Sequence, residues 1–101
     1  MNVQELVETL ALEPIHLGNA DRDISGGYAS DLLSCVMAKA QPGHVWVTLQ
    51  AHPNVVAVAS LLDLAAVIVT EAVVPDGETV TRARENGTNL LSSPQGTFAV
   101  V

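Results

Sequence analysis

The sequence predicts an α/β domain with three layers (α/β/α), in which helices flank a mainly parallel sheet of about four strands. Strand-like and helix-like segments alternate from Ile15 to Leu91, and this alternation is typical of parallel sheets joined by crossover helices. The segment Ala66–Thr70 (AVIVT) is a continuous apolar, mostly β-branched run, as expected for a strand covered on both faces. A length of 101 residues predicts a single domain spanning 1–101.

The first half of the chain predicts two helices and one strand. Apolar residues recur at helical spacing over 3–10, and Asn2 can cap this helix, with Glu5 completing a capping box. A short strand over 15–18 (IHLG) follows, and then a polar loop. A second apolar face predicts a helix over 28–39, which Gln-Pro-Gly ends.

The second half repeats the alternation. Residues 45–50 (VWVTLQ) predict a strand, and the helix that follows, begun by His-Pro-Asn, is apolar nearly all round from Val55 to Leu64. After the strand at 66–70 comes a more polar helix, with Asp76 as its cap and Gly87 as its stop. Residues 88–93 predict a last strand, and 94–101 begin a final helix that is either truncated or short.

Composition and charge exclude several classes of partner. Apolar residues make up 49% of the chain and charged residues 15%, which is typical of a globular protein. Four basic against eleven acidic residues give a net charge of −7, so neither a nucleic acid polymer nor an anionic membrane is expected as a partner. The absence of an early basic residue argues against a signal peptide, and the single cysteine fits a reducing cytoplasm.

Polar residues gather in two loops that the predicted topology places at the carboxyl edge of the sheet. Ligands of open α/β sheets usually bind at that edge. Bare glycine backbone before a helix leaves its first amides open to an anion, and the amide and imidazole side chains offer donors and acceptors. The expected ligand is small and polar, for instance nucleotide or phosphate-bearing. The predicted ligand-binding residues are Asp23, Ser25, Gly26 and Gly27 from the first loop, and Gln50, His52 and Asn54 from the second.

Four of these residues also have a purely structural interpretation. The glycine pair can simply form a turn with one positive φ angle and close helix–sheet packing. Asn54 can cap the helix that follows it. His52 precedes Pro53, which holds it extended, and can bond a neighbouring loop. Both interpretations stay open at this point.

The sequence predicts neither catalytic nor metal-binding residues, and it indicates no particular cofactor. Paired CxxC and HExxH motifs are missing, and no Lys-Ser or Lys-Thr pair follows the glycines, so the chain has no P-loop and is not a kinase by itself. An enzyme, for instance a hydrolase using Asp23 or His52 as general base, is a third hypothesis, which nothing in the spacing requires.

The segment from Asp23 to Ala72 resembles the DRTGG domain family. It carries an aspartate and glycine pair (DISGG), a DLLS helix and a WVT-Q-H-N strand end. The family motif is altered here, with isoleucine in place of its arginine and serine in place of its threonine. The resemblance implies an α/β/α domain like the N-terminal domain of HPr kinase/phosphorylase, a regulatory or accessory role beside CBS-domain pairs, dimer contacts, and no defined catalytic residues.

Two functions are therefore expected from the sequence. The first is a non-catalytic regulatory or assembly module that forms a homodimer or binds another protein, because the helix over 55–64 has more apolar surface than one buried stripe requires. That surplus lies either under a neighbouring loop or against a second subunit. The alternative is a small-ligand sensor that uses the two polar loops.

Overall fold

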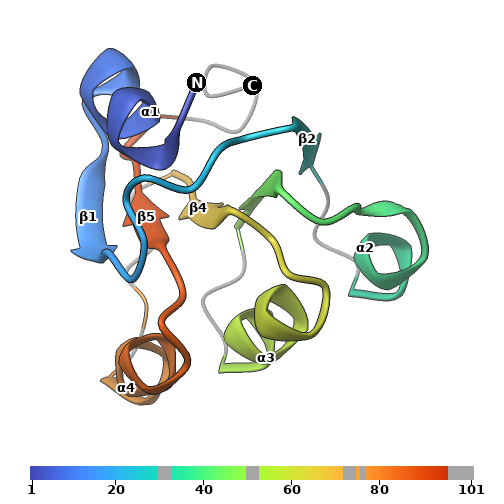
Figure 1. Cartoon of the computed structure of the whole chain (residues 1–101). Helices are drawn as coiled ribbons and strands as arrows, with labels where there is room; N and C mark the ends of the chain where they lie inside the picture. The colour runs from blue at the N-terminus through green and yellow to red at the C-terminus, as the bar shows by residue number, and fades with distance from the viewer. Residues whose placement is uncertain (30–32, 50–52, 72–74, 76, 96–101) are drawn as a thin grey trace.

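The computed structural model describes residues 1–29, 33–49, 53–71, 75 and 77–95. Its centre is a five-stranded sheet with the order β1-β5-β4-β3-β2. The elements, in chain order, are α1 (Val3–Leu10), β1 (Glu13–His16), β2 (Gly26–Ala29), α2 (Leu33–Lys39), β3 (His44–Thr48), α3 (Pro53–Leu61), β4 (Ala66–Val69), α4 (Gly77–Asn86) and β5 (Leu90–Ser92). Figure 1 shows the sheet between two helical layers, as predicted.

The order of the strands decides where the helices lie. From β2 to β5, each strand pairs in parallel with the next one along the chain. Because crossovers between parallel strands are right-handed and these all step in one direction, α2, α3 and α4 lie on one face of the sheet (Figure 1). Only α1 lies on the opposite face among the described helices. That face is consequently less fully covered.

Side chains of the central strands alternate between two apolar cores. Trp46, Val67 and Val69 point toward α2, α3 and α4, and all three are buried. Val45, Val47 and Ile68 point toward α1 and join its Val3 and Leu6 in the second core. Both faces of β3 and β4 are therefore apolar, as expected for strands inside a parallel sheet.

The predicted α/β class is confirmed, but the sheet is mixed and has five strands instead of about four. Strand β1 pairs antiparallel with β5, with a register irregularity between Pro14 and His16. The chain reaches β1 from α1 through a short turn around Ala11, whose φ of 51° is left-handed. The alternation of strands and helices predicts which strands are neighbours in the sheet. It does not predict the direction of an edge strand, which depends on the end of the sheet at which the chain leaves the preceding helix.

The predicted helix over 28–39 is wrong in its first part. Tyr28 and Ala29 belong to the edge strand β2, which starts at Gly26, and α2 begins at Leu33. Tyr28 packs on the face of the sheet that α2, α3 and α4 cover. A helix and a strand can both direct an apolar side chain to such a face, so the apolar pattern alone does not distinguish them. Glycine is a poor helix former, and pairing with β3 gives this segment a partner for its backbone.

The apolar surplus of α3 is explained within the fold. Val55, Val56 and Val58 are buried, and α3 lies between α2 and α4 on the sheet (Figure 1). Neighbouring helices thus cover both flanks, and the exposed strip is Asn54, Ala57, Ser60 and Leu61. None of the helices in the described ranges is long and apolar enough to cross a bilayer.

Candidate interaction surface

The structure does not bring the glycine pair of the first loop close to Asn54, the described residue of the second set. Gly26 and Gly27 pair with His44 and Val45, so they lie at the amino end of β3. Asn54 lies in the first turn of α3, beyond the carboxyl end of β3, and Gln50 and His52 lie outside the described residues. The prediction of one shared cleft is therefore wrong in its geometry, because an unexpected strand moves the glycine pair to the opposite end of the sheet. Ligand binding by each set stays a prediction.

The residues before the glycine pair are held by backbone contacts. Asp23 forms an isolated bridge with Asn2, and the Ile24 amide donates to the Met1 carbonyl at 2.9 Å. The Ser25 hydroxyl donates to the carbonyl oxygen of Pro42 at 3.0 Å. These contacts fix the entry into β2, so Ser25 has a structural partner.

The glycine pair forms part of the floor of an apolar groove on the α1 side of the sheet. The groove has a volume of ≈ 420 Å³, within the usual range of ligand pockets. Leu6 and Leu10 of α1 form one wall. Further lining residues are Met1, Ile24, Gly26, Gly27, Tyr28, Ala29, Val45, Val47 and Ile68. Within the described residues, a Cβ at Gly27 would meet the Val45 carbonyl oxygen at 3.5 Å, an ordinary contact, so crowding there does not require glycine.

Buried hydroxyl groups gather at the carboxyl ends of the parallel strands. Thr48 is the last residue of β3, and Thr70 directly follows β4. The Thr70 amide donates to the Thr48 carbonyl oxygen at 3.0 Å. Thr79 of α4 is also fully buried, and Ser93 is 3% exposed. The described strands β2 to β5 show no reversal of order, the feature that opens a crevice in doubly wound sheets. The carboxyl ends of these strands (the carboxyl rim) therefore carry polar residues, but the order of the strands does not open a crevice between them.

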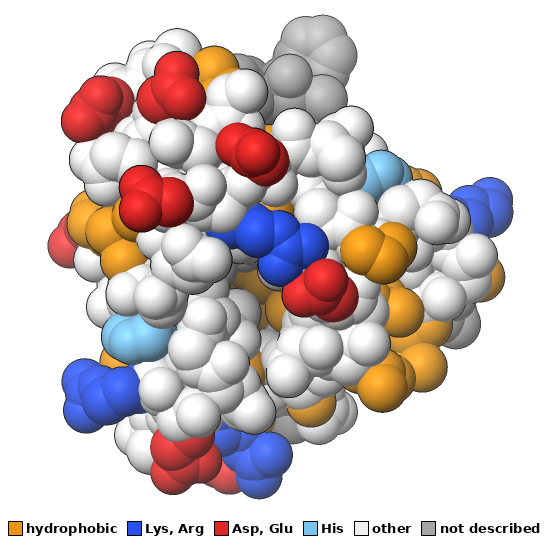
Figure 2. Space-filling view, viewed as in Figure 1, with side chains coloured by type: hydrophobic (Ala, Val, Ile, Leu, Met, Phe, Trp, Pro, Cys, Tyr) orange, Lys and Arg blue, Asp and Glu red, His pale blue; other side chains and the backbone are white. Residues whose placement is uncertain are grey.

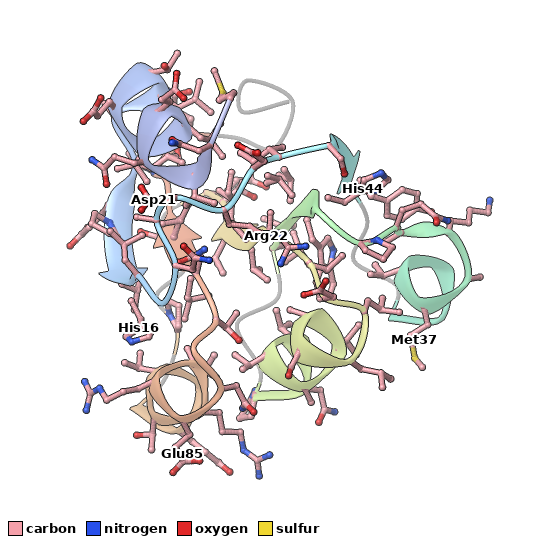
Figure 3. All side chains as sticks on the ribbon, in the orientation of Figure 1. His16, Asp21, Arg22, Met37, His44 and Glu85 are labelled. Atoms are coloured by element: carbon pink, nitrogen blue, oxygen red, sulfur yellow. The ribbon has the colours of Figure 1, made fainter. Side chains whose placement is uncertain are left out.

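At the amino rim, an ion pair that the sequence did not predict ties the loop before β2 to the end of α3. Arg22 donates to both carboxylate oxygens of Asp63, at 2.9 and 3.1 Å, and to its backbone carbonyl at 3.1 Å. Figure 3 shows Arg22 reaching from this loop toward α3. Hydrogen bonds from Arg22, and then its charge, lower the pKa of Asp63. The bidentate geometry favours arginine over lysine at this position.

This ion pair predicts a specific pH dependence of stability. A carboxyl with a lowered pKa in the folded state stabilises the fold above its unfolded pKa of about 3.9, and the contribution is lost as pH falls through the folded value. We expect the wild type to lose stability more steeply below about pH 4 than Asp63→Asn does. Urea unfolding of both proteins between neutral and acid pH measures this, and parallel curves would contradict it. Because both side chains are solvent-accessible, the difference should be small.

Charge is distributed unevenly over the molecule. The segment 24–44, which contains β2 and α2, holds one acidic residue (Asp31) and one basic residue (Lys39), so it is neutral in a chain of charge −7. In Figure 2, acidic side chains gather over α1 and α4, and none is visible over α2. Met37 of α2 is 51% exposed and points away from the sheet (Figure 3). The β2–α2 end (residues 24–44) is therefore the neutral end of the molecule.

Among the side chains that the structure describes, no group of three His, Cys, Asp or Glu residues is placed to hold a metal ion. A second pocket, at the amino rim, is polar and has a volume of ≈ 120 Å³, which is small for an organic ligand. It is lined in part by Asn19, Arg22 and Asn89. The groove and the neutral end are thus the larger features open to a partner.

Comparison with known proteins places the fold. No family model matches the chain, and no curated protein matches it. A solved structure does: the CBS and DRTGG domains of the regulatory region of Clostridium perfringens pyrophosphatase, complexed with the activator diadenosine tetraphosphate. The TM-score is 0.76 at 14% sequence identity, and the match covers 98% of this chain and 44% of that one. The chain therefore has a DRTGG-like α/β fold and spans less than half the length of this neighbour.

Proposed function

We propose that the chain is a non-catalytic regulatory or assembly module that acts in the cytoplasm as a homodimer. The neutral end carries this proposal. Two copies of a chain with charge −7 repel each other over most of their surface, and this repulsion is weakest where residues 24–44 face each other. The exposed side chain of Met37 adds apolar surface at the same end. The likeness to a regulatory region supports a regulatory role.

The sequence offered another basis for dimerisation, the apolar surplus of α3. That surplus packs inside the fold, and only Leu61, 71% exposed, remains as a large apolar side chain on the outer strip of α3. The neutral end is therefore the better-supported contact surface. A protein partner other than a second copy would meet the same surface.

The first test is the mass of the chain in solution. We expect light scattering coupled to size exclusion to give twice the chain mass of 10.5 kDa at about 100 µM. Dilution should shift the population toward the monomer without loss of helical signal, because each copy has its own buried cores. A monomer throughout this range would contradict the homodimer.

A ligand sensor is the second candidate, favoured by the likeness to a regulatory region that was solved with a nucleotide activator. Backbone amides at the start of α3 and α4 face the carboxyl rim and suit an anionic group. On this proposal Gln50, His52 and Asn54 contact the ligand. Asp23, Ser25, Gly26 and Gly27 would need a separate contact at the amino end of the sheet.

Thermal shift measurements test the sensor. The panel contains inorganic phosphate, AMP, ATP and diadenosine tetraphosphate, each with and without Mg²⁺. A compound held at 100 times its Kd should stabilise the fold by about 2.7 kcal/mol, which raises Tm by roughly 10–20 °C for a domain of this size. His52→Ala should reduce the shift. An unchanged Tm across the panel would leave the carboxyl rim as a purely structural feature.

A further inference from the structure

The two edges of the sheet are built differently. At one edge, β1 carries Glu13 and Pro14, and its register with β5 is irregular between Pro14 and His16. Charged residues, proline and bulges are devices by which natural proteins prevent an edge strand from pairing with another chain. The β1 edge therefore has three protections within four residues.

The β2 edge has none of these in its four residues, Gly-Gly-Tyr-Ala. Its register with β3 is regular throughout, and Gly26, Gly27 and Ala29 are exposed. In a parallel pair, alternate residues of an edge strand direct their N–H and C=O groups away from the partner strand. Strand β2 thus offers backbone donors and acceptors, with little side chain in the way at its two glycines.

We propose that β2 pairs antiparallel with β2 of a second copy, so that two five-stranded sheets join across a two-fold axis. This inference rests on the homodimer proposed above and assigns its contact surface. A two-fold axis makes a strand its own partner, so one unprotected edge is sufficient. The pairing also brings together the neutral ends, where like charges oppose association least.

The ladder alone is smaller than a stable interface, which buries about 800 Å² on each partner. Helix α2 lies on the helical side of the sheet beside β2 (Figure 1), and the axis relates it to its copy in the second subunit. Exposed Met37 on α2 points away from the sheet (Figure 3), so it adds apolar area at the outer side of α2 and not beside the strands themselves. The interface consists of β2 at its centre and α2 beside it.

Two substitutions of the same type test the proposal. Ala29→Glu places a carboxylate on the exposed end of β2, where antiparallel pairing of the whole strand sets it against Gly26 of the second copy and brings two added negative charges into the interface. Ala57→Glu adds the same charge on the exposed strip of α3 and serves as the matched control. We expect Ala29→Glu to raise the dimer Kd by about tenfold or more, and Ala57→Glu to leave it near the wild-type value. Circular dichroism and thermal unfolding verify that both variants fold.

Amide hydrogen exchange gives a second measurement that needs no variant. The outward amides of β2 should exchange several-fold more slowly at dimer-forming concentration than after dilution to the monomer, while the amides of β1 should not change. A wild-type dimer that tolerates Ala29→Glu and leaves the β2 amides unprotected would overturn the pairing but keep the homodimer. Dissociation by Ala57→Glu alone would assign the interface to α3 and overturn the pairing. A monomeric wild type would overturn the proposed homodimer and the pairing together.

Discussion

Gly18→Ala is expected to destabilise the fold by about 3 kcal/mol or more, although position 18 lies on the surface. A Cβ atom at Gly18 would overlap the backbone carbonyl group of Gly87. The Gly87 group is main chain and the position of a Cβ is fixed by its own backbone, so no side-chain rotation relieves the contact. The Gly18 amide also donates to the Asn89 side chain at 2.8 Å, and a shift of the loop breaks this bond. This loss is a large part of the total stability of a domain of this size.

Urea unfolding measures this effect, with Gly77→Ala as its control. Gly77 is the first residue of α4, and a Cβ there meets no atom of the described residues within 4 Å. The same chemical change at Gly77 should therefore be neutral, or stabilise by about 0.4–1 kcal/mol through the unfolded state. Equal stability of the two variants would mean that the loop at Gly18 moves freely away from α4, contrary to the structure.

Asn89→Leu is the second substitution with a large expected effect. The Asn89 side chain is 4% exposed and makes four hydrogen bonds to backbone groups. Its oxygen accepts from the amides of Gly18 and Asn19 at 2.8 and 3.0 Å, and its amide donates to the carbonyls of Asn19 and Ala65 at 2.8 and 2.9 Å. Leucine has the same number and branching of side-chain heavy atoms but leaves these groups unpaired, at an expected cost of about 3–4 kcal/mol.

The consequence should be local as well as global. Asn89 joins the loop after β1 to Ala65, the residue before β4, so hydrogen exchange in 18–22 should rise even where the variant remains folded. Asn86→Ala is the control, because that exposed side chain makes one bond, to the Arg82 carbonyl at 2.9 Å. It should change the unfolding free energy by no more than about 0.5 kcal/mol. A similar loss of unfolding free energy in both variants would contradict the stabilising role assigned to the four hydrogen bonds of Asn89.

Local signals in the sequence predicted several elements correctly. The capping box of α1 is present, with Asn2 and Glu5 exchanging side-chain and backbone bonds. Helix α4 ends at Asn86, and Gly87 adopts a left-handed φ of 65°, as its position predicted. The continuous apolar run at Ala66–Val69 is a strand buried on both faces. Each of these signals depends on a few residues adjacent in the chain.

The candidate site could not be predicted in the same way. Gly26 and Gly27 were expected in a loop before a helix, yet they start an edge strand at the amino end of the sheet. A segment of four residues with two glycines has little intrinsic preference, so its pairing with β3 decides its state. The Arg22–Asp63 ion pair joins residues 41 positions apart, and no pattern within the chain indicates such a contact.

The sequence by itself determined the α/β class, the parallel centre of the sheet and the apolar faces of its helices, because short-range periodicity and helix ends encode them. Tertiary structure alone decided the antiparallel direction of β1, the existence of β2 and the separation of the glycine pair from Asn54. Among the described residues, it also made β1 an edge strand with a charge, a proline and a register irregularity, and β2 an edge strand without them. These outcomes depend on backbone pairing between segments distant in the chain. The free energy of such pairing depends on both segments together, so the local sequence of either one does not predict it.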